Sequence, residues 1–302
     1  MIFKNLTIYS FNKPAPSMAE IEEKLTEKPF SPCAKMQLVS SGWAFPLGKH
    51  GSMYGQSIEG KTMLCLKTEA KVLPPACVSD ALKNRVDEIE QKEDRRIIGK
   101  EKADLKEDII MGMLPNAFVK SSLMYGYIDH ISGLLIINTG SRPRAEDFVS
   151  TLRDALGTLP VLPLMANNHP VSVLTQWVKQ GYADMPFSLG KSCKMASLDE
   201  EGQTVSANNH DLEQESIVCH ISEGKVVNRL SLVHDGETSF DLCDDLVMKK
   251  VKFGPAFSDK MDDFNADSVA AEFDAQFSLM SLELSRLIPD VVYALGGEPD
   301  PQ

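Results

Sequence analysis

The segment from Ala76 to Met113 constrains the fold most, because it places a long helical pattern between two sections that mix strands with helices. Its apolar residues recur mostly at three- and four-residue steps, with charged residues almost everywhere between them. Gly99 lies within this pattern and Pro115 follows it, so we expect two consecutive helices. We assign residues 76–120 to a helical arm.

The sections on either side of this arm each combine strands with one helix. In the first section, Ser17 and Glu20 form a capping box that predicts where its helix begins. In the second section, a predicted hairpin precedes a helix that begins near Pro143. We therefore expect a central α+β body of two similar lobes, formed by residues 1–75 and 121–170.

Residues 171–302 are expected to form a β-meander with helices, including a fingertip region and a C-terminal helix. Asp235 and Gly236 are typical of a tight hairpin turn between two predicted strands. Asp267 is expected to cap the last helix, and Pro289 is expected to break it. Strands and helices in this irregular order predict an α+β fold with mixed or antiparallel sheets, because a wound parallel sheet needs regular alternation.

The composition excludes several classes of protein. The chain has 302 residues, of which 43% are hydrophobic and 25% charged, as in ordinary globular proteins. No apolar run is long enough to cross a bilayer and no secretory signal is recognisable, so we expect a soluble, cytoplasmic protein. The six cysteines have neither C-x-x-C spacing nor zinc-site spacing with histidines. We therefore expect reduced cysteines and no metal or other cofactor.

The net charge of −12 and the pI near 5.0 argue against an ordinary DNA-binding domain, which is basic. Basic residues nevertheless outnumber acidic ones locally in the predicted arm, where they could face a phosphate backbone. They are Arg95, Arg96, Lys100 and Lys102. The alternative is a solvated helix face on which charges of both signs pair with each other.

A second group of basic residues lies in a predicted strand near residue 250. The alternation of side chains along a strand places Lys250 and Lys252 on one face and Lys249 on the other. Two neighbouring lysines can follow phosphates, but lysines on an edge strand also prevent aggregation. Both interpretations stay open at this point.

A group of carboxylates is the feature most typical of an enzyme. Asp244 and Asp245, with Asp241 before them, could hold Mg²⁺ for phosphodiester hydrolysis. The alternative, which the neighbouring strand patterns favour, is a polar turn in which aspartate bonds its own backbone. Phe118 follows a helix stop, and from residue chemistry alone we expect it to plug a core.

Taken together, short motifs along the chain make it resemble the RdgC family of bacterial recombination-associated proteins. The first motifs are Phe3-Lys4-Asn5-Leu6, Pro32-Cys33, Gly42-Trp43, Lys71-Val72-Leu73-Pro74 and Leu114-Pro115-x-Ala117-Phe118. The next are Ala145-Glu146-Asp147, Leu156-Gly157-x-Leu159-Pro160-Val161-x-Pro163-Leu164 and Thr175-x-Trp177-Val178. The last are Gly224-Lys225-Val226-Val227, Cys243-Asp244-Asp245, Phe273-Asp274-Ala275 and Leu295-Gly296-Gly297-Glu298.

The resemblance implies a ring-shaped homodimer whose central hole is lined by positive charge and admits double-stranded DNA. Members of the family bind DNA with little sequence preference and restrain the recombinase RecA. The resemblance also implies that Phe118 makes a dimer contact, which replaces its interpretation as a core plug. A ring can concentrate basic residues inside while its outside is acidic, so the overall charge does not exclude DNA.

The fingertip pair of the family, a lysine followed by glutamine, falls on Asn209 and His210. The lysine is absent here, and a second family lysine just before it is Asn208, so we expect a weaker grip on phosphates unless His210 contributes when protonated. The predicted DNA contacts are Arg95, Arg96, Lys100, Lys102, Lys120, Asn209, His210, Lys250 and Lys252.

The sequence thus predicts a non-enzymatic, nucleoid-associated DNA-binding homodimer that acts on recombination. Two alternatives stay open. The first is a metal-dependent nuclease that uses Asp244 and Asp245. The second is a protein-interaction module that contacts the recombinase directly, with DNA incidental.

Overall fold

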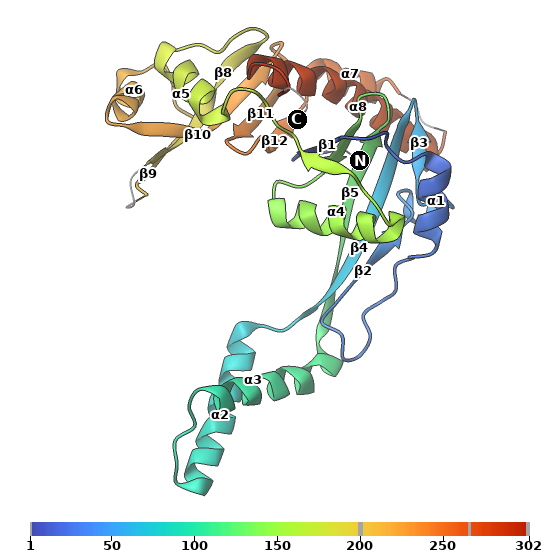
Figure 1. The fold of residues 1–302 in the computed structure, drawn as a ribbon, viewed down its shortest axis with the longest axis vertical. Coiled ribbons are helices and arrows are strands. Elements are labelled where there is room, and N and C mark those ends of the chain that lie inside the picture. Colours follow the sequence, from blue (N-terminus) through green and yellow to red (C-terminus); the bar gives the residue numbers. More distant parts are fainter. Residues whose placement is uncertain (1, 199–201, 265–266, 300–302) are drawn as a thin grey trace.

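The computed structural model describes residues 2–198, 202–264 and 267–299. Over these residues the chain is an α+β protein with two antiparallel sheets, as the sequence predicts (Figure 1). None of the helices in this described part is long and apolar enough to span a membrane.

The first sheet has seven strands and unites the two sections that flank the arm. Its order is β2-β4-β5-β6-β1-β7, with β3 beside β4. The strands are β1 (Thr7–Phe11), β2 (Val39–Ala44), β3 (Gln56–Ile58), β4 (Lys61–Val72), β5 (Phe118–Asp129), β6 (Leu134–Ile137) and β7 (Val161–Pro163). β4 and β5 pair along their full length, so the two sections form one sheet instead of the two lobes that the sequence suggested.

Two helices cover one face of this sheet, α1 (Met18–Thr26) and α4 (Arg142–Leu156). The hydroxyl of Ser17 accepts a hydrogen bond from the Glu20 amide at 3.3 Å, which confirms the predicted helix start. Phe148 of α4 packs edge-on against Trp43 with ring centres 5.3 Å apart. The apolar stripe of each helix is thereby buried on the sheet.

The second sheet has five strands in the order β12-β11-β10-β8-β9. The strands are β8 (Phe187–Ser197), β9 (Thr204–Asn208), β10 (Lys225–His234), β11 (Thr238–Cys243) and β12 (Met248–Lys252). The helices of this part are α5 (Pro170–Gln180), α6 (Glu215–Ser222), α7 (Pro255–Asp262) and α8 (Val269–Ala294). Asp235 and Gly236 both have positive φ angles, 48° and 72°, which confirms the predicted hairpin.

Helix α8 joins the cores of the two sheets. Its Phe277 contacts Tyr127 of the first sheet at a ring distance of 5.4 Å, and it shares one buried cluster with β8, β10 and β11. Ser268 caps the helix in place of the expected Asp267, and the helix continues through Pro289 to Ala294. Pro289 cannot donate its backbone hydrogen bond, but the buried apolar residues around it hold the helix together.

The arm consists of α2 (Pro75–Glu93), α3 (Lys100–Met113) and the short turn η2 (Leu114–Asn116). The predicted break between two helices is confirmed, and Gly99 has a φ angle of 60° there. The arm extends from the far end of β4 and β5, away from the rest of the molecule (Figure 1). The division into a body, an arm and a C-terminal region, with boundaries at residues 75, 120 and 170, stays a prediction.

Candidate nucleic-acid interface

The second sheet has one apolar and one polar face. Along β10, Leu230 and Leu232 point into the core, so Arg229 lies on the opposite face. Arg229 pairs across the sheet with Lys194 of β8, which shares its face. The polar face also receives lysines from β12. We call this surface the basic face, and it comprises Lys194, Arg229, Lys249, Lys250 and Lys252.

A bulge in β12 brings all three of its lysines to this face. The register changes from Asp241 opposite Lys249 to Ser239 opposite Lys252, so three steps on β12 match two on β11. Lys250 is the extra residue, with a φ angle of 55°. The prediction that Lys249 lies on the face opposite Lys252 is therefore wrong, because strict alternation assumes a strand without a bulge.

Asp241 is buried within the basic face, with 5% of its surface exposed. Its Oδ2 lies 2.9 Å from Nζ of Lys250, without hydrogen-bond alignment, and 3.8 Å from Nε of Arg229. These two cations compensate a carboxylate that could not be buried alone. Lys194, Lys249 and Lys252 have no carboxylate within 4.0 Å among the described residues, so their charges are free for an anionic partner.

The N-terminus of the chain and the start of α4 extend the basic face. Leu6 pairs with Met248, and the amide of Val251 donates to the carbonyl of Lys4 at 2.9 Å. Arg142, at the start of α4, pairs with Asp245 through Nε at 3.2 Å. Lys4 therefore borders β12, and Arg142 borders the turn between β11 and β12. Sequence reasoning missed both residues, as well as Lys194 and Arg229, because only the tertiary contacts place them here.

The Asp244-Asp245 segment is a turn between β11 and β12, as the favoured interpretation predicts. Oδ1 of Asp245 accepts from the amide of Val247 at 3.2 Å, and the amide of Leu246 donates to Cys243. In the part of the chain that the structure describes, no group of three or more histidine, cysteine or acidic residues is placed to hold a metal ion.

The arm residues differ in how free their charges are. Arg95 binds Glu101 through both terminal nitrogens at 2.6 and 2.7 Å, and its Nε lies 2.7 Å from Glu93. These hydrogen bonds raise the pKa of Arg95, and the two that Glu101 accepts lower the pKa of its carboxyl group. The other three DNA contacts predicted on the arm helices and their loop are exposed and have no ion pair within the described ranges. They are Arg96, Lys100 and Lys102.

Phe118 is exposed over 86% of its surface, so the core-plug interpretation is wrong. It begins β5 at the base of the arm, beyond the part of the sheet that the helices cover. Val72, its cross-strand partner, and Val119 are also exposed, at 42% and 47%. Lys120 follows on the same strand and is exposed.

Asn209 and His210 follow β9 at the end away from the β8–β9 hairpin turn, and do not form its tip. Asn209 has a φ angle of 54°, and the amide of His210 donates to the carbonyl of Lys191 at 2.9 Å. The structure thus gathers the β12 lysines on one face. Of the other predicted contacts, it leaves those of the arm and Lys120 on separate elements (Figure 1).

Comparison with known proteins gives a match over almost the entire chain. The family model described as "RdgC: Putative exonuclease, RdgC" matches residues 1–298. The "Recombination-associated protein RdgC" of Psychromonas ingrahamii is 36% identical over 299 residues, and the alignment covers 99% of each chain. The protein of the same name from Tolumonas auensis is 37% identical with the same coverage. That of Pseudomonas putida strain GB-1 is 36% identical over 304 residues, with 100% of this chain and 99% of the relative covered.

Proposed function

The chain belongs to the RdgC family, and we propose that it binds double-stranded DNA without sequence preference, as a homodimeric clamp that restrains the recombinase RecA. The name of its relatives associates them with recombination. In this proposal the protein is not an enzyme and acts at the nucleoid by occupying the duplex.

The basic face carries this proposal. On a chain with a net charge of −12, one sheet face gathers five basic side chains around a single buried carboxylate, Asp241. Lysine and arginine contacts to phosphates supply affinity but do not read base sequence. Lys194, Lys249 and Lys252 are the strongest candidates because no carboxylate neutralises them within the described residues. Local charge of this kind attracts DNA even when the whole molecule is acidic.

The proposed ring needs a second copy of the chain. The arm and the second sheet extend from different ends of the first sheet and leave one side of the outline open (Figure 1). Phe118 at the base of the arm, with Val72 and Val119 beside it, offers exposed apolar surface where two copies could join. We propose that this contact closes the ring. The exposed arm residues Arg96 and Lys100 would add phosphate contacts.

Binding to one labelled duplex across a salt series, with Mg²⁺ present, tests the proposal. We expect intact DNA and a linear loss of log affinity with log salt. About 6–10 phosphate contacts would cost roughly 10³–10⁵ in affinity between ~50 and ~200 mM salt. An affinity that does not change with salt, or the absence of binding, would refute the proposal that the protein is a DNA clamp.

The same experiment separates the nuclease alternative, which the description of the matching family model makes relevant. Cleavage that requires Mg²⁺ and disappears in Asp244→Ala would identify the turn between β11 and β12 as a nuclease active site. A stable complex with the recombinase in the absence of DNA would instead favour direct protein contact. Asn209 and His210 stay candidates for a second DNA or dimer contact, because Asn209 is exposed and His210 is half-buried.

A further inference from the structure

An apolar pocket lies on the first sheet and is separate from the basic face. It has a volume of about 690 Å³, within the roughly 300–1,000 Å³ range of ligand sites. Lys67 of β4 and Leu123 of β5 form a cross-strand pair in its wall. This pair lies on the sheet face that carries Tyr127, which packs against α8. The basic face, by contrast, is the side of the second sheet turned away from its core.

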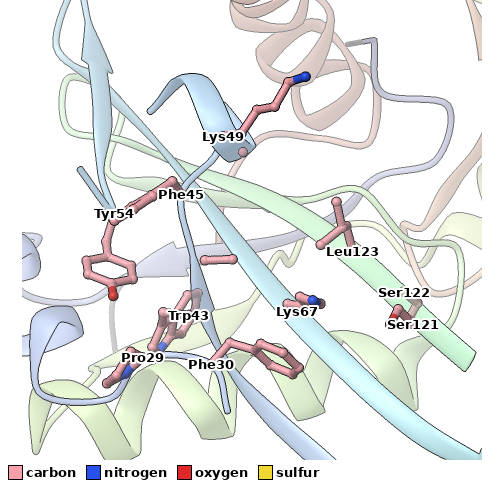
Figure 2. Close-up of a pocket in the computed structure, with 12 residues that line it drawn as sticks. Pro29, Phe30, Trp43, Phe45, Lys49, Tyr54, Lys67, Ser121, Ser122 and Leu123 are labelled. Atoms are coloured by element: carbon pink, nitrogen blue, oxygen red, sulfur yellow. The ribbon is translucent and has the colours of Figure 1, made fainter. Parts of the chain in front are cut away.

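Aromatic and aliphatic side chains make most of the pocket wall. Phe45 and Tyr54 pack together with ring centres 4.7 Å apart. Figure 2 shows this pair on one side of the pocket, with Phe30 and Leu123 elsewhere around the same space. Leu123 is half-exposed, at 50%. Because these apolar groups border an open space, a bulky apolar side chain from another molecule would remove their surface from water.

The charge around the pocket is positive. Lys49 lies at one end, and Nζ of Lys67 lies 4.1 Å from the centre of the Phe30 ring (Figure 2). Glu69, outside the lining, lies 3.7 Å from Lys67 and partly neutralises it. Lys49 has no ion pair among the described residues, and no acidic side chain of the described chain lines the pocket. A ligand that combines an apolar group with carboxylates would therefore match both the wall and the rim.

We propose that this pocket binds a segment of a partner protein that presents a bulky apolar side chain flanked by carboxylates. The apolar side chain would pack between Phe45 and Leu123, and the carboxylates would approach Lys49 and Lys67. A protein segment fits better than DNA, because the wall is mostly apolar and the unpaired lysines of the basic face lie on a different surface. The clamp could then hold DNA on one surface and a protein on another.

The test uses the full chain and short fluorescein-labelled peptides in an anisotropy titration. The probe is a peptide with the core Asp-Leu-Phe-Asp. Two control peptides change one feature each: Lys-Leu-Phe-Lys reverses the charge, and Asp-Ser-Ser-Asp removes the apolar side chains. We expect saturable binding of the first peptide only. Leu123→Asp should abolish it, and Lys49→Glu should weaken it by about fivefold, the scale of an exposed ion pair. Leu162→Asp is the matched control, because Leu162 is 51% exposed on β7 and does not line the pocket.

Four outcomes would overturn the proposal. The first is equal binding of the lysine peptide, which would show that the lysines at the rim do not select an acidic ligand. The second is unchanged binding in Leu123→Asp, and the third is no binding of the first peptide by the wild type. The fourth is displacement of the first peptide by oligothymidylate, which would make the pocket a nucleotide site. Duplex affinity of Leu123→Asp is measured in parallel, and we expect it to be unchanged.

Discussion

Replacing Lys252 by alanine should remove a phosphate contact without disturbing the fold. Lys252 is exposed on β12, and within the described part of the chain it has no ion pair whose loss would leave a charge uncompensated. Arg95 is the contrasting position, because Glu93 and Glu101 already engage its guanidinium. If free charge decides DNA binding, Lys252→Ala should weaken binding and Arg95→Ala should not.

The magnitude follows from the release of counterions. Each phosphate contact contributes about 0.9 to the slope of log affinity against log salt. A homodimer carries Lys252 twice, so Lys252→Ala should lower the slope by about 1.8. Between ~50 and ~200 mM salt, the affinity ratio of wild type to variant should therefore shrink about twelvefold.

Fluorescence anisotropy with two duplexes of unrelated sequence measures both slopes. The change should be the same for both sequences, because a phosphate contact carries no base information. Thermal melting of each variant provides the folding control. The reasoning is refuted if Lys252→Ala keeps the wild-type slope, or if Arg95→Ala lowers the slope as much as Lys252→Ala does.

Three further predictions test the dimer contact, the packing and the pH dependence. Phe118→Asp should convert the proposed homodimer to a monomer in analytical ultracentrifugation, and Leu162→Asp should not; a dimeric Phe118→Asp would remove this contact. A Cβ at Gly126 would lie 2.9 Å from Cζ of Phe148. Gly126→Ala should therefore lower the free energy of unfolding by about 1–3 kcal/mol in denaturant melts. An unchanged free energy of unfolding would contradict this packing. Burial lowers the pKa of His130, so the unfolded chain binds its proton at higher pH and the free energy of unfolding should fall below about pH 6.5. His130→Asn should reduce this fall, and an equal fall would show that other groups cause it.

Local chemistry determined many elements from the sequence alone. Ser17 caps its helix through a contact within three residues, and Gly99 separates two helices by its own backbone conformation. The positive φ angles at Asp235 and Gly236 likewise belong to the turn itself. Such features depend on a few neighbouring residues, so they can be predicted without knowing what the rest of the chain does.

The tertiary structure decided what these elements do together. The pairing of β4 with β5 merged two expected lobes into one sheet, and burial around Pro289 carried a helix through a residue that usually ends one. The bulge at Lys250 turned the β12 lysines to one face, while Arg95 was neutralised by neighbours on both sides of its loop. Contacts between distant residues decide whether a charged side chain is paired, whether it is exposed, and on which face of a sheet it lies. Local sequence patterns do not encode those contacts.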